Sequence, residues 1–131
     1  MGERAKRTKL LCKNVLTARS LAADITVALN FSYWIFKERN ALKKYFQAAR
    51  KHLKPGGAFV LDIYGGPDAQ IESTEERDLE GFTYIWEQGP YNAFNANAKR
   101  YIHFRFPDGT EMRKAFIYDW RIWSFPEVQD L

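Results

Sequence analysis

Polar and aromatic side chains follow two apolar segments of the sequence, at the point where each segment ends. Asn30 to Trp34 come directly after the first segment, and Asp62 and Tyr64 close the second. If both segments are parallel strands, their carboxyl ends meet at one edge of a sheet, where ligands of such sheets bind. Aromatic faces attract cations, and a carboxylate can accept a proton. This edge is therefore the candidate binding or catalytic site.

Each of these residues also has a purely structural interpretation. Asn30 either positions a ligand or bonds the loop that it begins, and the ligand role is favoured. Asp62 is a candidate general base, but bonding of backbone amides is its favoured role, so no catalytic residue is assigned. Phe31 is expected in the core rather than against a ligand. Tyr64 lies at the edge of the sheet where substrate contact is expected.

The surrounding residues predict a strand-helix-strand unit over residues 9–66. Ile25 to Leu29 is apolar and uncharged, as expected for a parallel strand that is buried on both faces. Glu38 to Leu53 carries one apolar stripe at the period of a helix, and Pro55-Gly56-Gly57 ends it. Ala58 to Ile63 is the second buried strand.

The hydrophobic period changes to two over residues 82–123, which predicts an antiparallel sheet. Pro107-Asp108-Gly109 is a hairpin signal between two of its strands. Pro67 to Glu80 is acidic and polar, and we expect a surface loop or short helix there. The aromatic residues of this region are expected in a core or interface, and less so in a lid over the strand ends: Trp86, Tyr91, Tyr118, Trp120 and Trp123.

Several further residues have expected environments. Thr8 to Leu16 is predicted to form a short strand in which Cys12 is buried, and His103 is expected to be half exposed. Ser124 and Glu127 form a capping box that starts a helix, and such a helix is expected to continue in a longer relative. The basic amino end is interpreted as a solvated tail rather than a nucleic-acid contact: Arg4, Lys6, Arg7, Lys9 and Lys13.

Composition limits the class of protein. The chain has 131 residues, of which 46% are hydrophobic and 27% charged, which suits one globular domain. A single cysteine excludes an intrachain disulfide, and no metal site is expected, which fits a cytoplasmic protein. The longest apolar stretch, Ile25 to Phe36, is shorter than the ~20 residues that a membrane-spanning helix needs.

Three segments, in this order and spacing, resemble the carboxyl-terminal two thirds of a class I S-adenosylmethionine-dependent methyltransferase. Asp24 to Trp34 looks like the fourth strand of that family and its following loop, and Leu53 to Asp62 looks like the turn into the fifth strand. Leu10 to Val15 is similar to the third strand and the turn that contacts adenine. The resemblance covers roughly Lys9 to Leu131.

The resemblance implies S-adenosylmethionine as the cofactor and a small molecule as the methyl acceptor. The residues that it places near the cofactor are Asn14, Val15, Asn30 and Phe31. The residues that it implies for the acceptor site are Tyr33, Trp34, Tyr64 and Trp86. The family usually has an acidic residue where Asn14 stands, although an asparagine oxygen can still accept a hydrogen bond from an exocyclic amine.

The family's glycine-rich cofactor loop has no counterpart, because Gly56-Gly57 and Gly65-Gly66 are too closely spaced. We therefore expect an α/β fold, a partial Rossmann-like methyltransferase sheet with an added antiparallel β region, in one incomplete domain over residues 1–131. The leading hypothesis is a methyltransferase-like protein with an incomplete cofactor site. The alternative is a non-catalytic remnant that self-associates as an interaction module. A homo-oligomer or a missing amino-terminal half would complete the sheet.

Overall fold

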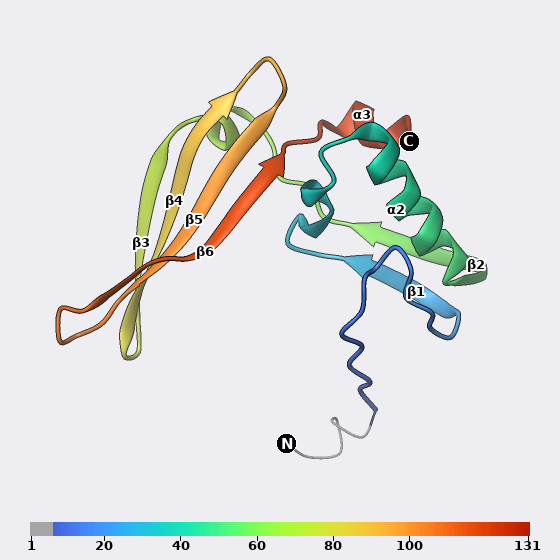
Figure 1. Ribbon diagram of the computed structural model, residues 1–131, viewed down its shortest axis with the longest axis horizontal. Coiled ribbons are helices and arrows are strands. Elements are labelled where there is room, and N and C mark those ends of the chain that lie inside the picture. The colour runs from blue at the N-terminus through green and yellow to red at the C-terminus, as the bar shows by residue number, and fades with distance from the viewer. Residues whose placement is uncertain (1–6) are drawn as a thin grey trace.

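The computed structural model describes residues 7–131, which form two joined regions (Figure 1). The basic residues Arg4 and Lys6 lie outside the described residues. The first region contains β1 (Ala23–Ala28), the 3-10 turn η1 (Ser32–Ile35), α2 (Arg39–Lys51) and β2 (Leu53–Leu61). The second contains η2 (Pro67–Gln70), β3 (Ser73–Leu79), β4 (Phe82–Asn92), β5 (Asn97–Arg105) and β6 (Glu111–Arg121), and α3 (Phe125–Gln129) follows it.

The first region is the predicted strand-helix-strand unit. β1 and β2 pair in parallel, with Val27 opposite Val60. Helix α2 buries Leu42 and Ala49, and its Phe46 ring lies 5.9 Å from the Phe59 ring of β2. The helix ends before Pro55, and β2 already begins at Leu53, earlier than predicted.

The glycine pair of β2 has a structural reason that is independent of any ligand. A Cβ atom at Gly57 would lie 2.9 Å from the main-chain oxygen of Asp24. Only glycine allows the two strands to approach this closely, because any side chain there would collide with the backbone of β1. Gly57 therefore belongs to the strand pairing.

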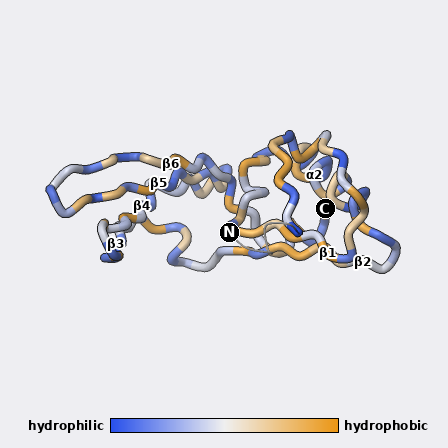
Figure 2. The backbone as a smooth tube through the Cα atoms, turned by 90° about the horizontal axis from the view of Figure 1, so that it is seen from below, coloured by the Kyte–Doolittle hydropathy of each residue, from blue (hydrophilic) through white to orange (hydrophobic). Residues whose placement is uncertain are grey.

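The prediction that the first strand is buried on both faces is wrong for this chain. The exposed fractions of Ile25, Val27 and Val60 are 63%, 54% and 46%. Helix α2 covers the opposite face, which carries Phe59, and the described residues provide no second layer over these three side chains. Figure 2 shows the hydrophobic stretches of β1 and β2 at the margin of the molecule, with α2 on one side of them.

The second region is an antiparallel sheet of order β3-β4-β5-β6. The predicted hairpin is confirmed: the amide of Phe106 donates to the carbonyl oxygen of Thr110 at 2.9 Å, and Gly109 has φ 84°. The prediction of a loop or short helix over Pro67 to Glu80 is wrong in part, because η2 is followed there by strand β3. β3 is an edge strand, and edge strands are often charged because charge prevents pairing with other chains.

The amino-terminal prediction is also wrong. Residues 7–22 contain no strand, and Cys12 is exposed rather than buried. Among the described residues β1 pairs only with β2, so residues 7–22 do not add a third strand to this sheet. At the other end the capping box is confirmed, since the Ser124 amide donates to a Glu127 carboxylate oxygen at 2.9 Å. None of the helices described is long and apolar enough to cross a membrane.

The two regions share one hydrophobic core at their junction. Trp34 of η1 is fully buried and packs edge-on against Trp120 of β6, with 5.6 Å between the ring centroids. The Trp123 indole donates to the carbonyl oxygen of Phe36 at 3.0 Å. The buried members of this core come from both regions and are Tyr33, Trp34, Leu42, Ala69, Ala98, Trp120, Ile122 and Trp123.

Candidate functional site

The turn after β1 is held in an unusual conformation by one carboxylate. Asn30 and Phe31 both have positive φ, 58° and 52°, which non-glycine residues seldom adopt. The two Asp62 carboxylate oxygens accept hydrogen bonds from the amides of Asn30 and Phe31, at 2.7 and 3.0 Å. A backbone that is strained in this way persists only where the surrounding structure stabilises it. The favoured prediction for Asp62, bonding of backbone amides, is thus confirmed, and no general base is assigned.

A cavity of about 460 Å³ lies between this turn, the end of β2 and one face of the antiparallel sheet. Phe31 and Tyr64 enter it from the carboxyl ends of β1 and β2, and Trp86 enters it from β4. The full lining is Phe31, Tyr64, Glu75, Arg77, Leu79, Tyr84, Trp86, Gln88 and Trp120. We call this cavity the junction pocket. Its volume falls in the range typical of small-molecule sites.

The walls of the junction pocket are mainly aromatic rings. The centroids of Phe31 and Tyr64 lie 5.4 Å apart, and those of Trp86 and Trp120 lie 6.4 Å apart. The ring of Tyr118 is tilted against that of Trp120, with 4.5 Å between the centroids. Ring faces of this kind bind planar groups by stacking and attract cations through their quadrupole.

Tyr33 and Trp34 do not line the junction pocket. Both are buried in the core, where the Tyr33 hydroxyl donates to the carbonyl oxygen of Asp62 at 3.0 Å. Burial raises the pKa of Tyr33 above its ordinary value. The ring of Trp34 lies 5.2 Å from that of Phe31, so these two residues support the pocket wall from behind.

Asn14 and Val15 lie in the exposed segment that precedes β1. The Asn14 side-chain oxygen accepts a hydrogen bond from the amide of Leu16 at 2.9 Å, and Val15 is exposed. Neither residue lines the junction pocket. The structure therefore brings together Phe31, Tyr64 and Trp86 from the predicted site residues, with Asn30 beside them in the turn.

Sequence reasoning missed Gln88, which fixes one wall of the junction pocket. Gln88 is only 5% exposed. Its oxygen accepts a hydrogen bond from the Tyr64 hydroxyl at 2.7 Å, and its amide nitrogen donates to Asp68 O and Ser73 Oγ at 3.0 and 2.8 Å. Because every polar atom of this side chain has a partner, Gln88 holds the Tyr64 ring in one orientation. The sequence did offer one indication of this role: Gln88 follows Trp86 by two residues in an alternating strand, which places both side chains on the same face.

A buried arginine ties the linker η2 to the antiparallel sheet. Arg100 is only 1% exposed, and it donates to the carbonyl oxygens of Ala69 and Gly89 at 2.6 and 3.1 Å. Burial lowers the pKa of its guanidinium. Together with Gln88, Arg100 keeps β3 and β4 at a fixed position relative to the end of β2.

His103 lies on the face of the sheet opposite the junction pocket. It is buried rather than half exposed as expected. Its Nδ1 accepts a hydrogen bond from the amide of Lys114 at 3.0 Å, and its Nε2 lies 2.9 Å from a carboxylate oxygen of Glu87. His103 therefore supports the pairing of β5 and β6 and does not face the junction pocket.

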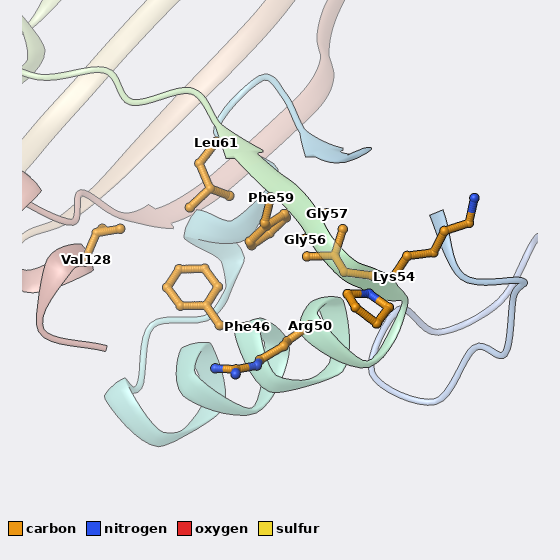
Figure 3. Close-up of a pocket in the computed structure, with 10 residues that line it drawn as sticks. Phe46, Arg50, Lys54, Gly56, Gly57, Phe59, Leu61 and Val128 are labelled. Atoms are coloured by element: carbon orange, nitrogen blue, oxygen red, sulfur yellow. The ribbon is translucent and has the colours of Figure 1, made fainter. Parts of the chain in front are cut away.

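A larger hollow, of about 680 Å³, lies between α2, β2 and α3. Phe46, Phe59, Leu61 and Val128 face this space (Figure 3). It extends along β2 to the start of that strand, at Leu53 and Pro55. Ligands of parallel sheets bind at the opposite ends of the strands, so the junction pocket is the better candidate site despite its smaller volume.

Comparison with models of known protein families finds no match, and comparison with curated proteins finds none either. Solved structures do match. An S-adenosylmethionine-dependent methyltransferase from Clostridium acetobutylicum has a TM-score of 0.74 at 22% identity, over 97% of this chain and 53% of that chain. DesVI from Streptomyces venezuelae has a TM-score of 0.70 at 15% identity, over 90% of this chain and 52% of that chain. The chain has the fold of part of a class I methyltransferase.

A further methyltransferase structure agrees with this assignment. It is an amino pentose methyltransferase from Micromonospora echinaspora with S-adenosylmethionine bound, with a TM-score of 0.67 at 14% identity, over 90% of this chain and 52% of that chain. The methyltransferase fold of the present chain thus spans about half the length of these solved structures. The predicted fold class, a partial Rossmann-like methyltransferase sheet with an added antiparallel region, is confirmed.

Proposed function

We propose that this chain forms the acceptor side of an S-adenosylmethionine-dependent methyltransferase that acts on a small molecule. The observation that carries the proposal is the junction pocket, an aromatic cavity at the carboxyl ends of both strands of a methyltransferase fold. This is the edge of the sheet where such folds bind ligands.

The residues at this edge fit one part of the cofactor. S-adenosylmethionine supplies an activated methyl group on a sulfonium when it is bound. Phe31 offers a ring face to a cation, and the exposed Asn30 side chain offers a donor and an acceptor. Asn14 and Val15 would contact the adenine only if their segment lies closer to the end of β1 in the assembled site. The sequence contains no glycine-rich loop for the rest of the cofactor.

The chain's own residues would act by binding and orienting the acceptor. Phe31, Tyr64 and Trp86 would enclose it, while Gln88 fixes Tyr64 and Asp62 fixes Phe31. Methyl transfer from a sulfonium needs alignment and exclusion of water more than it needs covalent help from the protein. An aromatic pocket with a rigid support meets the first of these requirements.

A sugar-sized acceptor is consistent with the cavity. The Micromonospora echinaspora neighbour is an amino pentose methyltransferase, and the junction pocket has a volume of about 460 Å³. Pockets of roughly this size enclose most of the surface of a small ligand. The volume therefore supports a small molecule as the acceptor.

A second candidate function is a self-associating module without catalysis. The observation that favours it is the uncovered apolar face of β1 and β2, with Ile25, Val27 and Val60 exposed. Parallel sheets are normally buried on both faces. A second copy of the chain, or a separate amino-terminal half, would cover this face.

The experiment that tests the leading proposal is an amide NMR titration of the labelled chain with S-adenosylhomocysteine, the product form of the cofactor. We expect saturable shifts confined to the turn from Asn30 to Trp34 and to the end of β2. Absence of shifts at the highest ligand concentration would contradict a cofactor contact at this turn. Light scattering on the same sample then tests the module, because a strict monomer would contradict self-association.

A further inference from the structure

Strand β3 carries charges on both faces, and the two faces differ in how these charges are paired. On the outer face, Glu76 receives two hydrogen bonds from the Arg105 guanidinium, both at 2.9 Å. Glu75 and Arg77 point to the other side, and within residues 7–131 neither forms an ion pair. Both line the junction pocket.

The strand register explains why these two charges reach the same pocket. Glu75 is opposite Trp86 and Arg77 is opposite Tyr84, and residues opposite each other on neighbouring strands share a face. Two residues apart on one strand, their Cα atoms are separated by about 7 Å. A carboxylate and a guanidinium at this spacing therefore stand beside the aromatic rings of Trp86 and Tyr84.

The chemistry of these two groups defines a ligand class. A guanidinium binds carboxylates and phosphates through paired hydrogen bonds, and a carboxylate binds an ammonium group. We propose that the junction pocket recognises a small molecule that carries both an ammonium group and an anionic group, Glu75 binding the first and Arg77 the second. The body of the ligand lies against Trp86 and Phe31.

This inference concerns binding, and it rests on the proposed function only in calling the ligand the acceptor. Charged residues on an edge strand also keep the edge from pairing with other chains. If protection of the edge were their only role, substitution of Glu75 or Arg77 would affect ligand binding no more than substitution of Glu76. The two explanations therefore separate in a ligand-binding experiment.

The experiment is a titration of the intact 131-residue chain, followed by tryptophan fluorescence, since Trp86 and Trp120 line the pocket. Four probes are compared: glucosamine 6-phosphate carries both charges, glucosamine the ammonium, glucose 6-phosphate the anion, and glucose neither. We expect glucosamine 6-phosphate to bind most tightly. A fifth probe, 2-amino-2-deoxyglucuronate, shows whether a carboxylate serves as well as a phosphate.

Substitutions in β3 test which residues are responsible for the difference in affinity between the probes. Glu75→Gln and Arg77→Gln should each weaken binding of glucosamine 6-phosphate by about two- to fivefold, the range of solvent-exposed charge pairs, since both residues are exposed. Glu75→Gln should not weaken glucose 6-phosphate binding, and Arg77→Gln should not weaken glucosamine binding, because each substitution removes only a charge that repels that probe. Glu76→Gln is the matched control on the outer face of the same strand and should change none of these affinities.

Equal affinity for all probes, no binding of either doubly charged probe, or an equal loss in Glu76→Gln would overturn the inference. None of these titrations contains cofactor. A negative result here therefore leaves the S-adenosylhomocysteine experiment intact, and a failure of cofactor binding leaves the charge recognition standing.

Discussion

The antiparallel sheet and the β1-α2-β2 unit both contribute to the junction pocket, but they bury their apolar residues differently. The part of the sheet next to the junction is covered, with Trp120 and Ile102 buried. The unit is covered only on the side of α2, and Ile25 and Val27 are exposed on its other side. The sheet is thus packed within this chain beside the junction, although Phe116 and Ile117 farther along β6 are exposed, whereas the unit is uncovered over one whole face.

This difference indicates which half of the proposed site the chain completes by itself. The proposed acceptor wall is assembled from described residues of both regions and is fixed by Gln88 and Asp62. The uncovered sheet face belongs to the unit that carries the proposed cofactor edge. The chain also spans about half the length of the solved methyltransferases that it matches. Acceptor binding is therefore expected to depend less on additional polypeptide than cofactor binding does.

The largest effect is expected where the two regions meet. Trp34→Ala removes a fully buried ring from the shared core and should lower the free energy of unfolding by about 3–5 kcal/mol. Urea unfolding measures the change. Phe94→Ala is the control, because Phe94 is 99% exposed and its loss should cost less than about 0.5 kcal/mol. A cost for Trp34→Ala as small as that of the control would contradict a shared core.

The two faces of the unit should respond differently to substitution. Leu42→Ala, on the covered face, should cost about 2–5 kcal/mol because it leaves a cavity. Val27→Thr keeps the side-chain shape on the uncovered face and should cost less than about 0.5 kcal/mol in the monomer. Thermal and urea unfolding at low protein concentration compare the two. Equal costs would show that the Val27 face is covered in solution.

Removal of the polar support of the pocket should have an intermediate effect. Gln88→Leu leaves Asp68 O and the Tyr64 hydroxyl without their buried partner and should cost about 1–3 kcal/mol. The aromatic NMR signals of Tyr64 should broaden or shift as its ring loses a fixed orientation. Gln47→Leu, at an exposed position of α2, is the matched control. An unchanged Tyr64 signal in Gln88→Leu would contradict the positioning role.

The smallest effect is expected at the outer face of β3. The hydrogen bonds from Arg105 lower the pKa of Glu76 below its ordinary value. Because the folded pKa is the lower one, this pair stabilises the fold above the ordinary glutamate pKa, and the contribution is lost as the pH falls through the lowered pKa. Arg105→Gln should raise the pKa of Glu76 in a carboxyl NMR titration, while Arg77→Gln should leave it unchanged. No rise in Arg105→Gln would show that the pair does not form in solution.

The elements with a strong hydrophobic period could be predicted from the sequence. Helix α2 and the hairpin at Gly109 follow from local patterns, and both are confirmed. β3 was missed because its edge position allows a polar, charged sequence with no apolar alternation. The burial of Val27 was predicted wrongly. An apolar strand sequence indicates that both faces of a complete sheet are covered, but it does not indicate whether the same chain supplies the covering layer.

The candidate site could be predicted only in part. Phe31, Tyr64 and Trp86 were found because each follows a strand or alternates within one. Glu75 and Arg77 were hidden in the segment expected to be a loop, and their approach to the pocket depends on the register with β4. Tyr33 and Trp34 follow a strand as well, but the positive φ angles of Asn30 and Phe31 turn the chain so that they enter the core. Sequence spacing alone does not specify that turn.

The most direct test of the central claim, that the ligand edge lies at the carboxyl ends of β1 and β2, is calorimetric titration with S-adenosylhomocysteine. The wild-type chain is compared with Phe31→Ala, in the junction pocket, and with Val128→Ala, in the hollow beside α2. We predict saturable binding that Phe31→Ala weakens and Val128→Ala preserves. An equal loss in both variants, or a loss confined to Val128→Ala, would contradict the claim.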